Sequence, residues 1–306
     1  MNVFTKARQE LAARMAGTGA TASIVSAGAL DEQRLQQPLL FRPETGLIAT
    51  LPMFEPFSSG SYEDLARLTV QTVNDMFPRL ALLVQASDAH RLREVSAEEF
   101  ASSNSDRAAA HALKQVFDRY GSDKATAHMY HLVYGRLMRD ADRFRKVLEI
   151  GLGTMNPDVV SNMGPAGRPG ASLRAFRDFL PKAMIFGADI DHRVLFEEER
   201  ISTHHVDQND LKSFEALGQH TGSDLDLVID DGLHTPSANL AVVLFALQHL
   251  RAGGWLVIED IRPSARPVWE VVSALMPADF DSVLVTTPRA LMFVSRRGDE
   301  KVARLA

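Results

Sequence analysis

Two acidic clusters, each directly after an apolar run, are the residues of this chain best suited to chemistry. Residues 230–234 read DDGLH after the run LDLVI, and the pair Glu259-Asp260 follows the run WLVI. If both runs are buried strands of one parallel sheet, the clusters emerge at its carboxyl edge, where open α/β folds bind small molecules. Carboxylate oxygens suit Mg²⁺ or Mn²⁺ better than zinc, so Asp231, Glu259 and Asp260 are candidate metal ligands. Because strand side chains alternate between faces, Glu259 and Asp260 converge only if the strand has already turned there.

An alternative interpretation gives these acids structural roles. Asp231 would cap a helix that begins near Pro236, and the acidic pair after the second run would bind Arg262 or Arg266. Three unpaired anions in one place would repel each other, and a bound cation resolves that repulsion.

His234 adds a group that can move a proton. It lies three positions after Asp231, on a predicted loop. An imidazole gains and loses its charge near neutral pH, so beside a carboxylate cluster His234 is the candidate catalytic residue. The other nine histidines are expected to have structural roles.

A glycine turn follows the first predicted strand, in the segment 149–153 with sequence EIGLG. Gly151 and Gly153 allow the backbone to turn tightly and to approach a ligand closely. A dinucleotide-binding loop needs a third glycine three residues further on, and that position is Asn156. The glycine-rich stretch from Met155 to Gly170 follows no strand and lacks a Walker lysine, so we expect a mobile loop over the site.

Acids also stand at the ends of the second and third predicted strands. Asp189 can accept both ribose hydroxyls of an adenosine, and Asp207 with Gln208 can reach an adenine edge. Each acid taken singly also fits a solvated loop or a helix cap. Their common place at one sheet edge favours a nucleoside site.

The elements that must position these groups are those of an α/β fold. From Val147 onward, apolar strand runs alternate with helix-length amphipathic stretches, as in a parallel sheet covered on both faces. Near the end, the runs around Pro288-Arg289 predict two strands joined by a tight turn. Two helices, roughly Arg107 to Tyr120 and Ala127 to Asp140, are expected before the first strand.

The first 105 residues lack this rhythm and predict a small α/β appendage. TASIVSAGAL and the runs flanking residues 43–46 resemble strands and a turn, and residues 62–77 have helical spacing after a Ser61 cap. A serine-rich polar stretch precedes residue 106 and marks a plausible boundary. We therefore expect an auxiliary region, 1–105, that shapes the substrate pocket or mediates oligomerisation, and a main domain, 106–306.

The composition narrows the possible functions. The 306 residues contain no cysteine, which excludes disulfides, thiolate zinc sites and cysteine nucleophiles. The formal charge of −6 and the lack of a Lys/Arg block argue against a nucleic-acid partner. No run of about 18 apolar residues predicts a membrane span, and residues 1–17 lack the apolar core of a secretory signal. We expect a cytoplasmic enzyme or binding protein.

Taken together, these motifs resemble those of class I S-adenosylmethionine-dependent methyltransferases. The order of the glycine turn, Asp189, Val206-Asp207, the DDGLH segment and VIED at 257–260 is most similar to the metal-dependent O-methyltransferases that modify macrolide sugars, the mycinamicin and macrocin type. The similarity extends from about Tyr120 to Val294 and includes GSDK at 121–124. It implies a Rossmann-like, mostly parallel seven-stranded sheet with an antiparallel last strand and helices on both faces.

The resemblance also implies a role for each motif residue. Mg²⁺ (or Mn²⁺) would be held by the three candidate ligands, and His234 would be the general base. The residues implied to contact S-adenosylmethionine are Glu149, Gly151, Gly153, Asp189, Asp207, Gln208 and Lys124. Asp230 is left undecided between a cofactor contact and structural support.

The implied reaction is methylation of a hydroxyl on a sugar or a glycosylated natural product, as in antibiotic tailoring, by a possible homo-oligomer. Catechol-like acceptors are one alternative, and an NAD-dependent oxidoreductase is another. A sensor that binds the cofactor without transfer is a third. The complete set of His234 and carboxylates favours an enzyme over the sensor.

Overall fold

The computed structural model describes residues 62–87 and 92–299. The chain divides into two compact units, Met1–Asn74 and Asp75–Ala306. The helix α3 (Tyr62–Ala86) begins in the first unit and confirms the helix expected from residue 62. The expected strands and turn before it, the Ser61 cap and the first 17 residues lie outside the described residues.

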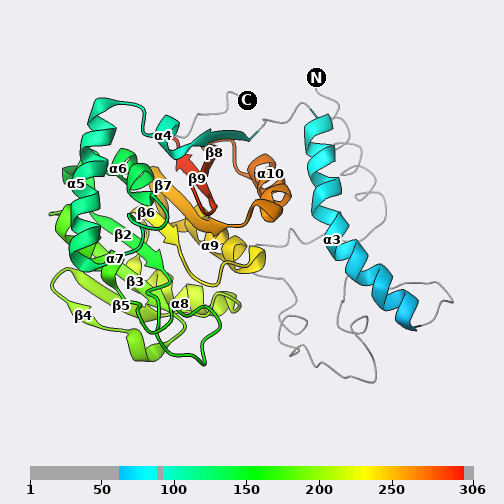
Figure 1. Cartoon of the computed structure of the whole chain (residues 1–306), viewed down its shortest axis with the longest axis horizontal. Coiled ribbons are helices and arrows are strands. Elements are labelled where there is room, and N and C mark those ends of the chain that lie inside the picture. Colours follow the sequence, from blue (N-terminus) through cyan, green and yellow to red (C-terminus); the bar gives the residue numbers. More distant parts are fainter. Residues whose placement is uncertain (1–61, 88–91, 300–306) are drawn as a thin grey trace, which may run out of the picture. The chain divides into compact units, whose positions relative to one another are not determined.

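The second unit contains one nine-stranded sheet, in the order β1-β8-β9-β7-β6-β2-β3-β5-β4 (Figure 1). Its strands are β1 (Arg93–Ser96), β2 (Lys146–Ile150), β3 (Met184–Asp189), β4 (Glu197–Glu198), β5 (Ile201–His205), β6 (Leu225–Asp230), β7 (Leu250–Ile261), β8 (Phe280–Thr286) and β9 (Leu291–Arg297). All neighbours pair in parallel except β9, which is antiparallel to β7 and β8, and β4, which is antiparallel to β5. The α/β class and the antiparallel last strand are confirmed. The sheet has nine strands, not seven, because β1 and β4 each extend one edge.

Helices cover both faces of the sheet. They are α4 (Ala97–Phe100), α5 (Asn104–Tyr120), α6 (Tyr130–Leu137), α7 (Ala171–Phe179), α8 (Leu211–Thr221), α9 (Pro236–His249) and α10 (Arg266–Leu275). Successive residues of β2 enter opposite cores: Val147 packs with Leu113 and Phe176, and Leu148 packs with Phe245 and Trp269. This alternation is the period of two that a strand buried on both faces requires.

The start of the sheet lies inside the range assigned from sequence to the auxiliary region. β1 pairs in parallel with β8, and Ser103 caps α5 through a capping box with Asp106. Residues 93–105 are therefore structurally part of the main unit. The second expected helix is shorter than predicted, because Lys124 and its neighbours form hydrogen-bonded turns before α6 begins at Tyr130.

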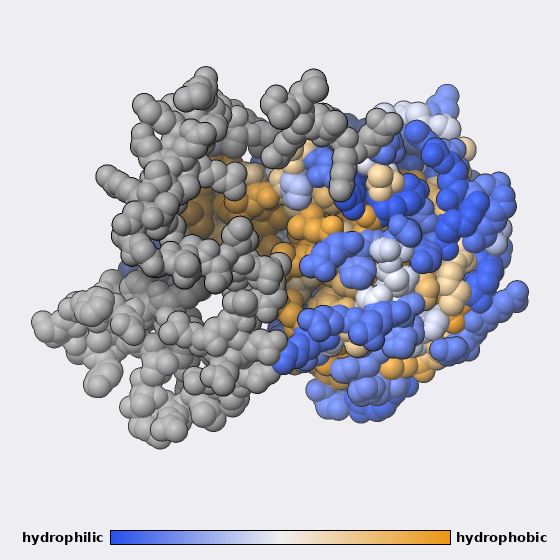
Figure 2. Space-filling view, turned by 180° about the vertical axis from the view of Figure 1, so that it is seen from behind, coloured by the Kyte–Doolittle hydropathy of each residue, from blue (hydrophilic) through white to orange (hydrophobic). Residues whose placement is uncertain are grey.

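The surface of the described residues is unevenly polar. Figure 2 shows apolar residues gathered beside a region covered by hydrophilic ones. Large side chains such as Leu83 on α3 and Leu275 on α10 remain exposed. Within residues 62–87 and 92–299, none of the helices combines the length and the apolar character needed to cross a bilayer.

The backbone turns at the carboxyl end of β7, as the adjacent acids require. The β7–β9 register shifts between Ile258 and Ile261, and Asp260 has a φ of 54°. This left-handed conformation is costly for a residue with a Cβ and lets Glu259 and Asp260 face a common region.

Gly151 fixes the spacing between the ends of β2 and β6. Its φ is 97°, and a Cβ at this position would clash with the backbone carbonyl of Asp231. Gly151 N–H also donates to Ala188 O, and Asp231 N–H donates to Ile150 O. Glycine is therefore needed both for the turn and for the close approach.

We expect Gly151→Ala to lower the free energy of unfolding by more than the roughly 1–2 kcal/mol that a left-handed residue alone costs. Urea denaturation followed by circular dichroism measures this loss. Gly164→Ala is the matched control, since Gly164 has a φ of 72° with no atom within 4 Å of the added Cβ. Equal losses for the two variants would show that the contact with Asp231 is unimportant.

Candidate active site

Two adjoining cavities lie at the carboxyl edge of the sheet. The larger, of about 640 Å³, includes Gly151, Asp189, Asp207 and Gln208 in its lining. The smaller, of about 170 Å³, is lined in part by Lys124, His128, Tyr130, Ser172, His234, Glu259 and Asp260. Gly151, Gly153, Ser161 and Asp231 line both. The arrangement offers one roomy compartment that opens into a small, charged one.

Lys124 occupies the centre of the charged compartment. Its side chain is 3% exposed, and Nζ donates to Asp231 Oδ2 at 2.5 Å and to Glu259 Oε2 at 2.6 Å. Glu149 Oε1 lies 3.2 Å from the same nitrogen. Lys124 therefore joins the segment before α6 to the ends of β2, β6 and β7.

Two tyrosines of α6 complete this polar network. Tyr130 donates to Asp260 Oδ1 at 2.5 Å, and Tyr134 donates to Glu259 Oε1. Both oxygens of Glu259 are thus occupied by protein donors, one from Tyr134 and one from Lys124. Burial, followed by the nearby carboxylates, raises the pKa of Tyr130, so its hydroxyl stays protonated as a donor.

Asp231, His234 and Asp260 meet at the exposed side of the compartment. One ligand atom from each lies within 4.8 Å of the other two. His234 Nε2 is 3.7 Å from Asp260 Oδ2 and 4.0 Å from Asp231 Oδ1, and its Nδ1 is buried without a hydrogen bond. His234 has a φ of 57°, so two of the three residues adopt the left-handed conformation. Such conformations persist only where the surroundings impose them, as they often do at functional sites.

Glu259 belongs to a second, more buried group with Glu149 and Asp231. The three predicted metal ligands therefore do not form one cluster in this arrangement, and Asp231 is common to both groups. The first group matches the preference of Mg²⁺ or Mn²⁺ for carboxylate oxygens, with an imidazole alongside. This donor chemistry fits a divalent cation, and Lys124 supplies the positive charge beside Glu259.

The electrostatics of the compartment favour added positive charge. Burial raises the pKa of Glu259 well above its ordinary value, and the negative charge of Asp231 raises it further. Burial lowers the pKa of Lys124, but the carboxylates of Asp231, Glu259 and Glu149 outweigh this effect and raise it. The raised pKa values of Glu149 and Glu259 mean that one ammonium group does not fully stabilise negative charge on the acids around it.

Asp230 has a structural environment. It is fully buried, and its two oxygens accept hydrogen bonds from the side-chain amides of Gln208 and Asn239, each at 2.8 Å. Gln208 Oε1 in turn accepts from Leu233 N at 2.8 Å. These contacts favour structural support over a cofactor contact for Asp230: it binds Gln208, which lines the larger cavity and accepts a hydrogen bond from the loop before His234.

Asp189 lies where a ribose contact was expected and also organises the glycine turn. Its Oδ2 accepts from Leu152 N and its Oδ1 from Asp191 N, both at 2.8 Å. Asp191 binds Thr154, Asn156 and Arg193. Asp189 reaches the larger cavity from this fixed position, while Asp191 anchors the start of the loop over the site.

The structure corrects the contacts expected under the structural interpretation of the acidic clusters, because Lys124, Tyr130 and Tyr134 bind these acids. Thr235, not Asp231, caps α9 by accepting from Ala238 N. Arg266 pairs with Glu94 and Glu270 rather than with the acids after the second run.

Some site residues were missed from sequence or lie elsewhere than expected. His128 was placed among the structural histidines, yet its Nδ1 lies 3.4 Å from Asp260 Oδ1 in the smaller cavity. Among the described residues, Glu149 does not line either cavity. It contacts Lys124 and Ser172, which line the smaller cavity. The available signal for His128 was its position four residues after the GSDK segment that the resemblance includes.

Comparison with known proteins agrees with this geometry. Residues 167–261 match a family model described as a methyltransferase domain. Residues 167–261 of this chain therefore resemble a methyltransferase domain. It is 30% identical over 153 residues to the 8-demethyl-8-alpha-L-rhamnosyl tetracenomycin-C 2'-O-methyltransferase of Streptomyces olivaceus, covering 50% of this chain and 38% of the relative. It is 34% identical over 152 residues to the mycinamicin VI 2''-O-methyltransferase of Micromonospora griseorubida, covering 49% and 36%.

A solved structure supports the same likeness. The MycE methyltransferase from the mycinamycin biosynthetic pathway, in complex with Mg and SAH, has a TM-score of 0.50 and 26% identity, covering 62% of this chain and 56% of that one. The resemblance to macrolide-sugar O-methyltransferases is confirmed. The matched region nevertheless spans well under half the length of the two curated relatives.

We expect Glu149 to make the folded sheet unit less stable as the pH rises. Burial raises the pKa of Glu149 above its ordinary value of 4.5. The folded protein then keeps a proton that the unfolded chain has lost, so the stabilising contribution is full below pH 4.5 and is lost as the pH rises through the folded-state pKa. Glu149→Gln removes this titration, and its free energy of unfolding should fall less between pH 5 and 8.

Urea unfolding across that pH range, in buffer containing EDTA, measures the difference. Glu215→Gln, an exposed acid on α8, is the matched control. A pH dependence of Glu149→Gln that equals that of the unsubstituted protein contradicts the prediction.

Proposed function

We propose that this protein transfers a methyl group from S-adenosylmethionine to a hydroxyl of a sugar or glycosylated natural product, in a Mg²⁺-dependent (or Mn²⁺-dependent) reaction. The observation that carries the proposal is the convergence of Asp231, His234 and Asp260 within 4.8 Å beside the glycine turn. The relatives named as sugar O-methyltransferases support the acceptor class. Antibiotic tailoring is the corresponding biological setting.

The larger cavity is the proposed site of the adenosyl group. Asp189 would bind the ribose, and Asp207 with Gln208 would border the adenine. The methionine portion would pass Gly151 and Gly153 toward Lys124 in the smaller cavity, which places the reactive end of the cofactor near His234. Glu149 supports this part of the site indirectly, by binding Lys124 and Ser172.

Asp231 and Asp260 are the residues best placed to hold the cation. Glu259 would join them only if its contact with Lys124 or Tyr134 were released. When bound, the cation would acidify a nearby acceptor hydroxyl and fix its position.

His234 is proposed to accept the proton from that hydroxyl. Its side chain is 29% exposed and borders the smaller cavity, so an acceptor can reach it. Tyr130 and His128 contact Asp260 from the opposite side and would keep that carboxylate oriented. An aliphatic hydroxyl is a poor nucleophile near neutral pH, so this proton transfer is central to turnover.

We expect His234→Gln to lower the rate of methyl transfer by about 10²–10⁴-fold, the usual contribution of a general base. Binding of S-adenosylmethionine should change little, because the larger cavity lacks His234 in its described lining. His111→Gln, on the exposed face of α5, is the matched control. Mass spectrometry of a panel of glycosides incubated with labelled cofactor measures transfer, and a fully active His234→Gln enzyme would refute the proposed base.

We expect EDTA to abolish transfer and Mg²⁺ to restore it, and Asp231→Asn to weaken the response to Mg²⁺. Thermal unfolding should show stabilisation by S-adenosylmethionine, about 2.7 kcal/mol at a concentration 100 times the dissociation constant, and none by NAD. Stabilisation by NAD alone would favour an oxidoreductase. Transfer to catechols but not to glycosides would change the acceptor class, and binding without any transfer would indicate a sensor.

The remaining expectations belong to the same proposal. The acceptor is proposed to be a small glycosidic molecule rather than a nucleic acid or a membrane. A cytoplasmic location follows from the use of an intracellular cofactor. The region before residue 106 is proposed to shape the acceptor site or to join copies of the chain into a homo-oligomer, which sedimentation analysis would detect.

A further inference from the structure

A third cavity, of about 380 Å³, lies at the opposite edge of the sheet from the acidic clusters. Its lining includes Trp255 in the middle of β7, Val283 of β8 and Arg296 near the end of β9. Phe100, Arg136 and Phe144 close it from the side of α4 and α6. Trp255 and Glu259 are four residues apart on β7, or about 13 Å along the strand, so this cavity is separate from the proposed active site.

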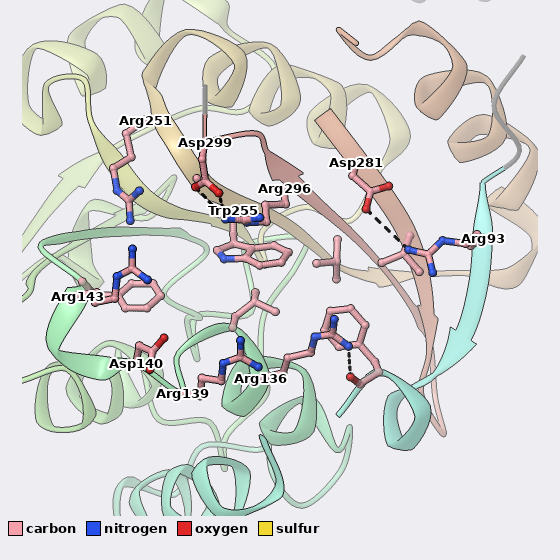
Figure 3. Close-up of a pocket in the computed structure, with 16 residues that line it drawn as sticks. Arg93, Arg136, Arg139, Asp140, Arg143, Arg251, Trp255, Asp281, Arg296 and Asp299 are labelled. Carbon is pink, nitrogen blue, oxygen red and sulfur yellow. Dashed lines mark hydrogen bonds and ion pairs between the residues drawn. The ribbon is translucent and has the colours of Figure 1, made fainter. Parts of the chain in front are cut away.

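The cavity is rich in arginine although the whole chain carries a formal charge of −6. Its lining contains three aspartates, Asp140, Asp281 and Asp299, and six arginines, Arg93, Arg136, Arg139, Arg143, Arg251 and Arg296. Figure 3 shows arginines reaching it from opposite sides, with Trp255 between them. Such a concentration of like charge is unfavourable unless carboxylates of the protein or bound anions match it.

Only some of these guanidinium groups are neutralised by the protein. Four of the six are paired: Arg93 with Asp281 at 3.8 Å, Arg139 with Asp106 at 3.0 Å, Arg251 with Asp226 at 2.6 Å and Arg296 with Asp299 at 2.9 Å. In the described part of the chain, Arg136 and Arg143 have no carboxylate partner. Arg136 donates to the carbonyl of Phe100 and stacks on its ring, whereas the Arg143 side chain makes no hydrogen bond or ion pair within the described residues.

Trp255 provides a flat apolar surface within this basic lining. The indole is half-buried, and the guanidinium carbon of Arg296 lies 5.6 Å from its ring centroid. Phe144 adds a second aromatic side chain to the lining. An aromatic ligand would stack on such a surface while its anionic group paired with the arginines.

The volume of the cavity limits the size of the anion that it can bind. A volume of about 380 Å³ falls in the range of about 300–1,000 Å³ that is typical of small-molecule sites. A nucleic-acid strand would need a longer basic track, and the net negative charge of the chain would repel it.

We propose that this cavity binds a small aromatic anion, a planar ring that carries a phosphate or a carboxylate. Arg143, which has no carboxylate partner in the described residues, binds the anionic group, and Trp255 stacks on the ring. The site is independent of the methyl transfer proposed at the opposite edge.

Tryptophan fluorescence tests the proposal in the full chain. The chain has two tryptophans, and Trp269 is only 1% exposed, so Trp255 is the residue that a bound ligand or acrylamide can quench. We expect phenyl phosphate or benzoate to quench this emission at low salt and less at high salt, since screening weakens charge pairing. The better of the two probes identifies the anionic group. Inorganic phosphate and phenol should each bind more weakly than the better probe.

Arg143→Gln should weaken binding of the better probe by about 10-fold, as measured by calorimetry, the effect expected for a lost charge-assisted hydrogen bond. Arg289→Gln, at the exposed turn between β8 and β9, makes the same charge change outside the cavity and should alter affinity by less than about 2-fold. Trp255→Leu should remove the preference for phenyl phosphate over inorganic phosphate if phosphate is the recognised group.

Several outcomes overturn the proposal. Equal effects of Arg143→Gln and Arg289→Gln would show that only overall charge matters. Binding of phenol as tight as that of the better anionic probe would show that the arginines are not used. Absence of acrylamide quenching in the full chain would show that Trp255 is inaccessible and that the cavity is filled by the protein itself.

Discussion

Lys124 places one buried ammonium group among carboxylates that come from three different strands. Glu149 stands on β2, Asp231 follows β6, and Glu259 stands on β7. Breaking a buried ion pair typically costs about 3–5 kcal/mol because it leaves a charge uncompensated. These ion pairs therefore hold the segment before α6 against the sheet. In this position, Tyr130 and Tyr134 of α6 donate hydrogen bonds to the acids of β7.

The same constraint explains why the backbone departs from regular geometry at the carboxyl edge. Gly151, His234 and Asp260 all have positive φ angles, and all three lie beside the acidic network. The two non-glycine residues pay a conformational cost that the network of Lys124 and the tyrosines must offset. The result is a fixed, partly exposed group of two carboxylates and an imidazole, next to a cavity large enough for a nucleoside.

The two edges of the sheet have opposite electrostatic character. The carboxyl edge concentrates acids around one lysine, while the cavity at Trp255 concentrates arginines. Both edges use α6 and β7: Tyr134 and Glu259 belong to the acidic side, and Arg136 and Trp255 to the basic side. Because the acidic cluster and the basic cavity lie at different positions along α6 and β7, one compact unit contains two chemically distinct cavities.

Much of the fold and part of the site follow from sequence, because local patterns report them directly. Alternation of strand runs and helices predicts the α/β class, and the glycine turn predicts a close approach that the Gly151–Asp231 contact explains. The adjacent acids Glu259 and Asp260 predict a turn in the strand, which the positive φ of Asp260 provides. The extra strands β1 and β4 are too short to give a clear pattern of their own.

The residues themselves determined the inventory of the site: its acids, its glycines, its histidine and the absence of cysteine. Only the tertiary structure decided their partners. In the structure, Lys124 lies between Glu149 and Glu259. His128, which was expected to have a structural role, lies beside Asp260. Asp230 accepts hydrogen bonds from Gln208 and Asn239. These contacts join residues that are far apart in the chain. A buried charge pairs with whichever donor lies nearest in the folded structure, and a local sequence pattern does not specify that donor.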